Sequence, residues 1–112
     1  MFSPADFRIP PASKSHMRVI SKSRLKEFQL IHPRATRPLD TWYQIVSRQD
    51  FADFNALKST FGASVDNVAP LVVFDIGGNK YRLIASIHFN TNICYVRHIL
   101  THAEYDLDRW KK

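Results

Sequence analysis

Residues 71–100 read LVVFDIGGNKYRLIASIHFNTNICYVRHIL and carry the clearest strand and turn pattern of the chain. This stretch opens with an apolar, β-branched run, and Gly77-Gly78-Asn79 then supplies residues that tolerate the positive φ of a tight turn. From 80 to 89, apolar residues alternate with others, which is the period of a strand with one buried face. Residues 90–92 turn the chain again, and 93–100 return as a third strand. The stretch therefore predicts an antiparallel meander.

The register of the second hairpin decides which polar residues meet. If Ile84 faces His98, then Arg82 and His98 become diagonal neighbours on one face, and a slip of one residue separates them. A closing helix is expected from 102 to about 110, because Thr101 and Glu104 form the capping box T-H-A-E. His102 and Tyr105 are three residues apart, so they share a helix face and can overhang the end of the sheet.

Before the meander, the patterns predict a strand over 17–21 and then helices. Ser21 or Ser23 can cap the first helix, and Pro33 ends it. A second amphipathic helix follows Pro38, and a short one over 54–61 is closed by Gly62. The expected buried positions of the first two helices are Leu25, Phe28, Ile31, Leu39, Trp42, Tyr43 and Val46.

The element order is thus β-α-α-(α)-β-β-β-α, which defines an α+β fold. A small antiparallel sheet is expected, with the first strand beside the meander, helices on one face and the other face partly open. Residues 1–16 carry three prolines and three serines and are expected to be a disordered or non-native extension. Residues 17–112 form the expected domain.

Length and composition exclude several classes of protein. The chain has 112 residues, 45% of them hydrophobic, and no apolar run long enough for a membrane-spanning helix. Its single cysteine, Cys94, cannot form an internal disulfide, and no Cys/His spacing resembles a zinc site. Three scattered glycines do not make a phosphate-binding loop. We therefore expect a cytoplasmic domain without metal or cofactor.

The net charge of +6 favours a polyanionic partner. Residues 1–50 hold nine basic and four acidic residues, whereas 51–112 hold seven and six. The second half of the chain is therefore nearly neutral, and a functional role of any cation there must come from its local position and not from an overall positive charge. Most candidate groups lie in the last third of the chain, namely Lys80, Arg82, Arg97, His98, His102 and Tyr105.

This set suits RNA cleavage without a metal ion. A base removes the proton of the 2′-hydroxyl, an acid protonates the leaving 5′-oxygen, and arginine balances the charge of the transition state. Histidine serves either proton transfer near neutral pH. Each residue also has a structural interpretation: His98 as a surface or core residue, His102 as part of the first helical turn, and Tyr105 as core packing. Lys58 is by default a solvated surface lysine, and the run Lys22, Arg24 and Lys26 is usually a solvated helix face, although it can also bind ribosomal RNA or an acidic partner segment.

Three blocks of the sequence resemble the HigB family of toxins, which belongs to the RelE-like superfamily of type II toxin–antitoxin modules. They are LKSTF (57–61), VFDIGGNKYRLIA (73–85) and CYVRHILTHAEYD (94–106). The resemblance runs from Met17 to about residue 110.

The resemblance implies an mRNA interferase, an endoribonuclease that cleaves translated mRNA, commonly on the ribosome, and inhibits translation. It also implies a small sheet packed by helices, a HigA-type helix-turn-helix antitoxin as partner, and operator DNA bound only through the toxin–antitoxin complex. No membrane association is expected. The alternative function is a non-catalytic basic module that binds RNA or protein on the same fold.

The site residues carried over are those with suitable chemistry at matched positions. Arg82 is expected to bind phosphate, His98 or His102 to transfer protons, and Tyr105 to transfer a proton or stack on a base. If His102 only begins the helix, acid/base chemistry passes to His98 and Lys58. The expected RNA-binding residues are Lys58, Lys80, Arg97, Lys22, Arg24 and Lys26.

Overall fold

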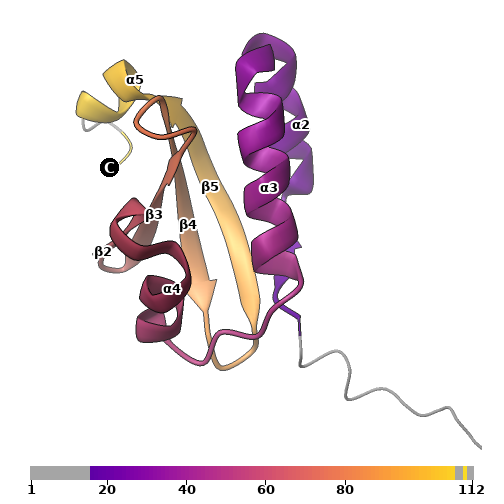
Figure 1. Cartoon of the computed structure of the whole chain (residues 1–112), viewed down its shortest axis with the longest axis vertical. Helices are drawn as coiled ribbons and strands as arrows, with labels where there is room; N and C mark the ends of the chain where they lie inside the picture. Colours follow the sequence, from indigo (N-terminus) through magenta and orange to yellow (C-terminus); the bar gives the residue numbers. More distant parts are fainter. Residues whose placement is uncertain (1–15, 108–109, 111–112) are drawn as a thin grey trace, which may run out of the picture.

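Five strands form one mixed sheet in the computed structural model, which describes residues 16–107 and 110. The order across the sheet is β1-β5-β4-β3-β2 (Figure 1). The expected meander is confirmed as β3 (Leu71–Ile76), β4 (Tyr81–His88) and β5 (Ile93–Thr101). Gly77 and Gly78 have φ of 63° and 72° in the turn between β3 and β4, the region in which glycine is unstrained.

The expectation of a purely antiparallel sheet is wrong at one edge. The first strand, β1 (Arg18–Ile20), pairs parallel with β5, with Val19 facing Cys94. Parallel pairing requires a long crossover, and all the helices before the meander lie between these two strands in the sequence. The fold is therefore α+β with a mixed sheet.

A strand that the sequence patterns missed, β2 (Val65–Val68), forms the other edge. It pairs antiparallel with β3, with Asp66 facing Val73. Only four residues long, it contains Asp66 and Asn67, both exposed and both of types depleted in strands. An edge strand with one free side tolerates such residues, whereas a buried strand does not.

Three helices precede the meander, and one closes the chain. They are α2 (Lys22–Ile31), α3 (Thr36–Ser47), α4 (Phe54–Phe61) and α5 (His102–Asp106), with short 3₁₀ turns at Pro33–Ala35 (η2) and Gly62–Ser64 (η3). The helix α5 ends earlier than expected, and residues 108–109 lie outside the described part of the chain. Across residues 16–107 and 110, we find no helix with the length and apolar content that crossing a bilayer requires.

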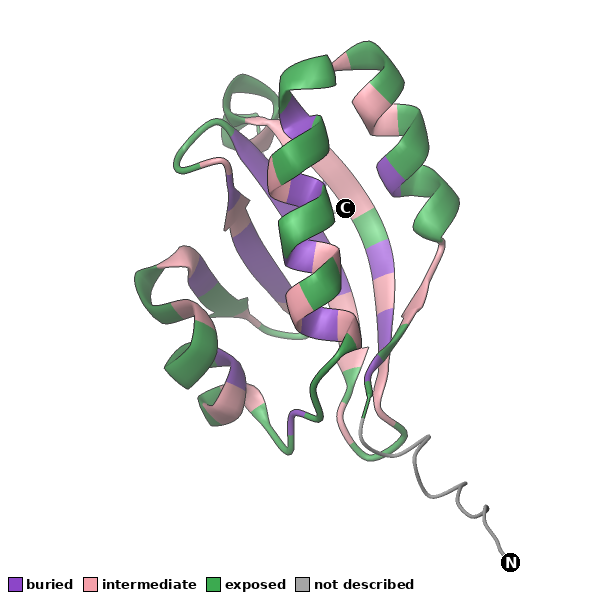
Figure 2. Ribbon diagram, turned by 45° about the vertical axis from the view of Figure 1, so that its right-hand side comes forward, coloured by how far each residue is buried: buried purple, intermediate pink, exposed green. Residues whose placement is uncertain are grey.

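The helices α2, α3 and α4 cover one face of the sheet, which we call the inner face (Figures 1 and 2). Phe74 of β3 lies at its centre, with ring centroids 5.4 Å from Trp42 and 5.1 Å from Phe61. The expected apolar face of α3 is confirmed, because Leu39, Trp42 and Val46 are buried.

The expected face of α2 is only partly right. Leu25 is buried and Phe28 contacts the ring of Tyr81 edge-on at 5.5 Å, but Ile31 is 73% exposed. The last turn of α2, which includes Leu30 and Ile31, is therefore largely exposed and is not covered by the sheet. No side-chain hydrogen bond from Ser21 caps this helix.

The opposite, outer face is less open than expected. A second, smaller core lies there, made by Val73, Ile84 and Trp110 with several half-buried neighbours. The Trp110 ring stacks on Tyr105 at 5.1 Å, and its Nε1 donates a hydrogen bond of 3.1 Å to the Tyr105 carbonyl. Trp110 thus packs against the sheet and α5.

The predicted N-terminal extension lies almost wholly outside the described residues, which begin at His16. The His16 carbonyl accepts a hydrogen bond of 2.8 Å from the Asn92 side chain. Met17 is buried, and its backbone nitrogen donates to the Gln49 carbonyl at 3.0 Å. The folded part of the chain is therefore anchored from residue 16 onward.

Candidate functional site

The hairpin of β4 and β5 has the expected register in the half nearer α5, where Ile84 faces His98 and Arg82 faces Leu100. The register then shifts, so that Ala85 faces Val96 and Arg97 is an extra residue in β5. Such a β-bulge places two consecutive side chains on one side of a strand. Both Arg97 and His98 consequently belong to the outer face.

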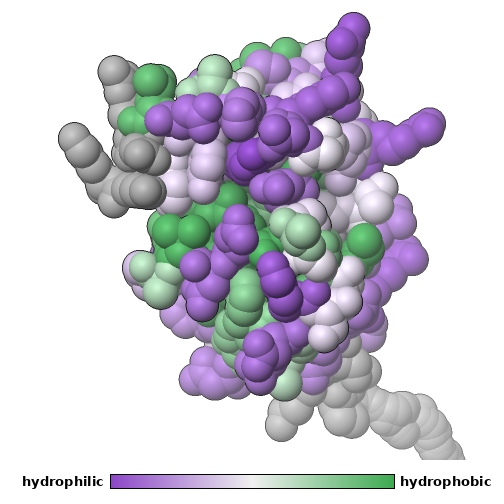
Figure 3. Space-filling view, turned by 60° about the vertical axis from the view of Figure 1, so that its left-hand side comes forward, coloured by the Kyte–Doolittle hydropathy of each residue, from purple (hydrophilic) through white to green (hydrophobic). Residues whose placement is uncertain are grey.

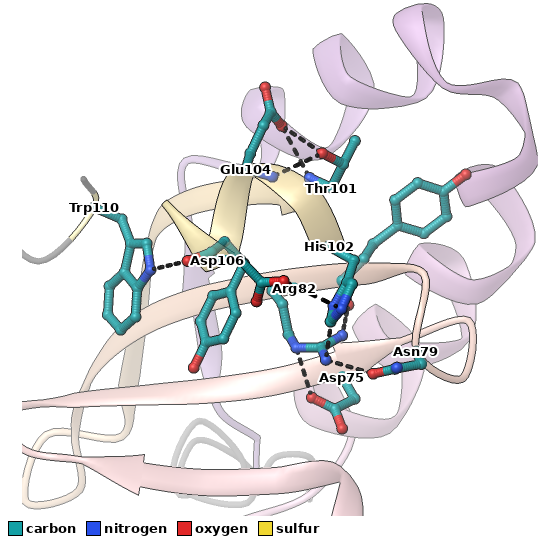
Figure 4. A network of polar contacts seen from close by, with 10 residues as sticks. Asp75, Asn79, Arg82, Thr101, His102, Glu104, Asp106 and Trp110 are labelled. Atoms are coloured by element: carbon teal, nitrogen blue, oxygen red, sulfur yellow. Dashed lines mark hydrogen bonds and ion pairs between the residues drawn. The ribbon is translucent and has the colours of Figure 1, made fainter. Parts of the chain in front are cut away.

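Arg82 is the only charged residue among the buried side chains of the described chain, with 7% of its surface exposed. Its Nε lies 3.2 Å from Oδ1 of Asp75, its partner on β3. One terminal nitrogen, Nη1, donates to the Tyr81 carbonyl at 3.1 Å. The other, Nη2, contacts the Asn79 side chain and Nδ1 of His102, the latter at 3.3 Å (Figure 4). Burial of this charge is balanced by these contacts.

The capping box fixes the position of His102. The Thr101 hydroxyl accepts a hydrogen bond of 3.2 Å from the Glu104 backbone, and Oε1 of Glu104 accepts one of 2.9 Å from the Thr101 backbone. The His102 backbone nitrogen donates to the Lys80 carbonyl at 3.0 Å. Together these bonds hold the first turn of α5 against the start of β4, so the imidazole lies beside Arg82.

The neighbours of His102 assign its tautomer. Arginine only donates, so Nδ1 of His102 accepts from Arg82, and the ring proton is assigned to Nε2. Nε2 lies 3.4 Å from Oδ2 of Asp106, one helical turn further on. The imidazole is 48% exposed. It is therefore oriented from inside the protein and accessible from outside.

Tyr105 completes this group of residues. Its ring centroid lies 5.2 Å from Cζ of Arg82, a cation–π distance. We call Asp75, Asn79, Arg82, His102, Tyr105 and Asp106 the Arg82 cluster. His102 and Tyr105 thus lie together at the end of the sheet, as their spacing predicts, and the structure adds that both contact Arg82.

Sequence reasoning missed Asp75, Asn79 and Asp106. A signal was present for Asp75, which is the one charged residue in the apolar run of β3. Burial raises the pKa of the Asp75 carboxyl; the charge of Arg82 opposes the shift, Asp66 adds to it and His102 opposes it. Asp75 accepts a proton more readily than an ordinary aspartate.

His98 lies apart from the contacts of the Arg82 cluster. It lines a pocket of about 290 Å³ together with Leu100, Glu104, Leu107 and Trp110. Burial lowers the pKa of His98, and the charges of Arg24 and Arg97 lower it further. The guanidinium of Arg82 points to Asp75, Asn79 and His102 instead, so the diagonal placement of Arg82 and His98 produces no pairing.

Two of the expected RNA-binding lysines differ in their surroundings. Lys80 is exposed and directly precedes β4, at the end of the sheet where His102 lies. Lys58 uses its Nζ to donate to the Val65 carbonyl at 3.2 Å, which ties α4 to β2. Figure 1 shows α4 and α5 at opposite ends of the sheet, so Lys58 lies away from the Arg82 cluster.

The basic run on α2 is divided between two sides of that helix. Lys22 and Lys26 line a crevice against α3, where the Lys22 ammonium lies 4.5 Å from the Tyr43 ring centroid. Arg24 faces β5 and lines a groove with Ile99. On β5 itself, the exposed Arg97 lies over the Tyr95 ring at 5.6 Å. Arg24 and Arg97 therefore flank His98, and the two lysines do not.

With this geometry described, comparison with known proteins establishes the class of protein to which the chain belongs. Residues 35–108 match a family model described as a RelE-like toxic component of a toxin–antitoxin system, HigB_toxin. The chain is 33% identical over 93 residues to the mRNA interferase HigB of Escherichia coli O6:H1, covering 80% of this chain and 89% of that relative. It is 32% identical over 93 residues to the mRNA interferase toxin HigB of E. coli K12, covering 80% and 88%.

The chain belongs to the HigB family of toxins. Membership of a toxin–antitoxin family implies an antitoxin as partner. The matched range contains every residue of the Arg82 cluster.

Proposed function

We propose that this protein is the toxin of a type II toxin–antitoxin system, an endoribonuclease that cleaves translated mRNA on the ribosome and so inhibits translation. One observation carries the catalytic part of the proposal. A half-exposed imidazole, His102, is oriented by a buried guanidinium, Arg82, and by the Asp106 carboxylate. Histidine held in this way is suited to proton transfer near neutral pH.

The proposed reaction needs no metal ion. The 2′-hydroxyl of the RNA loses its proton and attacks the adjacent phosphorus, and the bond to the 5′-oxygen breaks as that oxygen gains a proton. The products are a 2′,3′-cyclic phosphate and a 5′-hydroxyl. His102 moves one of the two protons, and the hydroxyl of Tyr105, on the same side of α5, is the candidate for the other.

Arg82 acts mainly through its charge and through positioning. Of its five N–H donors, Asp75, Tyr81, Asn79 and His102 engage four. One donor and the positive charge then remain to stabilise the phosphorane-like transition state. Lys80, exposed beside His102, supplies a cation that a phosphate can reach directly.

Further cations hold the RNA. Arg97 and Arg24 flank the outer face beside His98, and Lys22 and Lys26 extend the positive surface along α2 toward ribosomal RNA or the antitoxin. Lys58 lies away from the Arg82 cluster and would make only a peripheral contact with the RNA. RNA or ribosome binding should weaken as salt rises, because the phosphate contacts release counterions.

The proposed partners follow from the family. A HigA-type helix-turn-helix antitoxin would neutralise the toxin, and operator DNA would be bound only through their complex. The proposed location is the cytoplasm, where mRNA is translated. A small helix-turn-helix protein encoded in the neighbouring reading frame would support this pairing.

The test is induced expression of the full chain in bacteria, with growth and the 5′ ends of mRNA followed together. We expect growth arrest and new mRNA ends that carry a 5′-hydroxyl. In a purified system, translated mRNA should be cleaved, and a 2′-deoxy substitution at the scissile nucleotide should block cleavage there. Normal growth with intact messages would refute the nuclease.

A non-catalytic RNA- or protein-binding module is the second candidate. It is favoured by the contacts of Arg82, because most of its N–H donors already bind protein groups, as those of a purely structural arginine would. This candidate predicts salt-sensitive RNA binding with no new RNA ends. The purified assay separates the two, because binding and cleavage are measured on the same RNA.

A further inference from the structure

The strand β5 is paired along only part of one of its two edges. On one side β4 pairs with it over nearly its whole length, whereas on the other side β1 pairs only with residues 93–95. Within residues 16–107 and 110, no strand pairs with the rest of that side. We call residues 96–101 on this side the free edge of β5. An unpaired edge of this length is long enough to accept a strand from another chain.

We propose that an extended segment of the antitoxin adds to the free edge as a further strand of the sheet, with apolar side chains toward α2 and acidic side chains toward the outer face. The added strand would continue the line of β1 along β5. This inference rests on the antitoxin pairing in the proposed function, and it names the surface and the chemistry of that pairing.

The backbone of the free edge presents the groups that an added strand needs. The His102 nitrogen donates across to the Lys80 carbonyl, whereas the Thr101 nitrogen donates to Oε1 of Glu104. Backbone hydrogen bonds across an antiparallel pair involve alternate residues. The N–H and C=O of Ile99, two residues before Thr101, therefore point away from β4 as well. Ile99 thus offers a donor and an acceptor at the centre of the free edge.

The helix α2 extends past the sheet beside the free edge. Arg24, Glu27, Phe28 and Ile31 of this helix line a groove of about 210 Å³ together with Ile99. Phe28 is half-buried, and Ile31 is 73% exposed. Figure 2 shows α2 beside this part of β5 with no strand of the described chain between them. A strand added to β5 would extend the inner face under α2 and bury these apolar side chains.

The charges beside the groove fit an acidic segment. Arg24 and Arg97 both lie close enough to His98 to affect its titration, and Glu27 is the one acid among the residues that line the groove. Figure 3 shows hydrophilic side chains around the apolar surface on the side of the molecule that carries α5 and β2. Side chains of a strand alternate between its faces. The segment that fits therefore alternates apolar residues with aspartate or glutamate.

Strand addition at this edge also accounts for neutralisation of the toxin. Arg24 and Arg97 are proposed contacts of the RNA, and the carboxylates of the added strand would bind the same two guanidinium groups. RNA and antitoxin would then exclude one another, although the antitoxin strand need not touch His102. Binding of the antitoxin should weaken as salt rises, because these ion pairs are accessible to solvent.

The first test measures the affinity of the full chain for the antitoxin encoded beside it, by isothermal titration calorimetry. Ile31→Glu should weaken binding about tenfold or more, because it removes an apolar contact and repels an acidic segment. Leu30→Glu is the matched control: Leu30 is the neighbouring residue, is 83% exposed and does not line the groove. It should bind as tightly as wild type. Without antitoxin, both variants should cleave translated mRNA at the wild-type rate.

The outcomes separate the docking surface from the proposed function. Wild-type affinity of Ile31→Glu, or equal weakening by both substitutions, would overturn docking at the free edge and leave the antitoxin pairing standing. Absence of any antitoxin binding by wild type would refute the pairing, and the docking with it.

Hydrogen–deuterium exchange of the backbone amides tests the strand itself. With antitoxin bound, the amide of Ile99 should exchange about tenfold more slowly or less, because it gains a backbone partner. The amide of Cys94 should be unchanged, since Cys94 already lies between β1 and β4. Unchanged exchange at Ile99 in the complex would overturn the proposal. Protection of Ile99 in the chain alone as its concentration rises would also overturn it, by assigning the free edge to a second copy.

Discussion

The two faces of the sheet are built from alternating residues of the same strands, yet they differ in almost every physical respect. On the inner face, Phe74 and Leu83 are fully buried under helices. On the outer face, one step away along each strand, Asp75 and Arg82 form an ion pair. A small apolar core around Trp110 lies beside that pair.

The difference separates the origin of stability from the origin of chemistry. The inner face gains its free energy from apolar burial, which is insensitive to small changes in orientation. The outer face depends on directed contacts, because a buried guanidinium that loses its partners is strongly destabilising. Substitutions on the two faces should therefore affect different measurements.

The largest effect is expected from His102→Ala. Loss of a positioned acid/base group typically reduces rate by about 10²–10⁴-fold, while the free energy of unfolding should change little because the imidazole is half exposed. The measurement is mRNA cleavage together with urea unfolding. His88→Ala is the control, since His88 is an exposed histidine of the same face that contacts Tyr95. Equal activity of both variants would contradict the assignment.

Phe74→Ala tests the inner face. Removal of this ring leaves a cavity between Trp42 and Phe61, and such truncations cost about 3–5 kcal/mol of unfolding free energy. Urea unfolding measures the loss. Phe74→Leu should cost clearly less, because most of the volume is kept. A loss below about 1 kcal/mol for the alanine variant would mean that the inner face is not the main source of stability.

Thr101→Ala should affect both stability and cleavage, because it removes the hydroxyl that caps α5. We expect a loss of about 1 kcal/mol in unfolding free energy. Cleavage should fall as well, since the first turn of α5 orients His102. Thr101→Ser restores the hydroxyl and should restore both quantities. Activity lost with unchanged stability in both variants would point to a direct role of Thr101 in substrate binding.

The smallest effect concerns pH. The pKa of His98 is lowered in the folded protein, so the folded state binds fewer protons there than the unfolded state. The contribution of His98 to stability is therefore complete above about pH 6.5, the ordinary histidine pKa that the unfolded state keeps, and it is lost as the pH falls from there through the lowered pKa of the folded state. Arg24 from α2, Arg97 on β5 and Glu104 from α5 face this imidazole. Unfolding midpoints of His98→Gln should depend less on pH than those of wild type; parallel profiles would contradict this.

Much of the fold was predictable because its signals are local. Turn residues at Gly77 and Gly78, alternation in β4 and the capping box at Thr101 each act within a few residues. The strand β2 was missed because its pairing with β3, and not its own residue types, makes it a strand. The parallel pairing of β1 likewise depends on the path of the intervening helices.

The candidate site was predictable in part for a similar reason. The spacing of His102 and Tyr105 in a capped helix placed these two residues on one helix face in prediction and structure alike, whereas their contacts with Arg82 are seen only in the structure. His98 could not be separated from them by sequence, because the direction in which Arg82 points depends on Asp75 and Asn79. Exposure of Ile31 depends on where the sheet ends beneath α2, which no local pattern encodes.

The extra residue at Arg97 has a consequence for how this sequence can change. Side chains in a strand alternate, so the bulge reverses the parity of every position that follows it. If residues 96–100 alternated regularly with Arg97 kept and no bulge, His98 and Leu100 would point to the inner face, and Ile99 would point to the outer face. A single-residue insertion or deletion within β5 that the bulge does not absorb exchanges the inner and outer faces of the residues on one side of it, whereas deletion of Arg97 itself removes the bulge and leaves His98, Ile99 and Leu100 on their present faces.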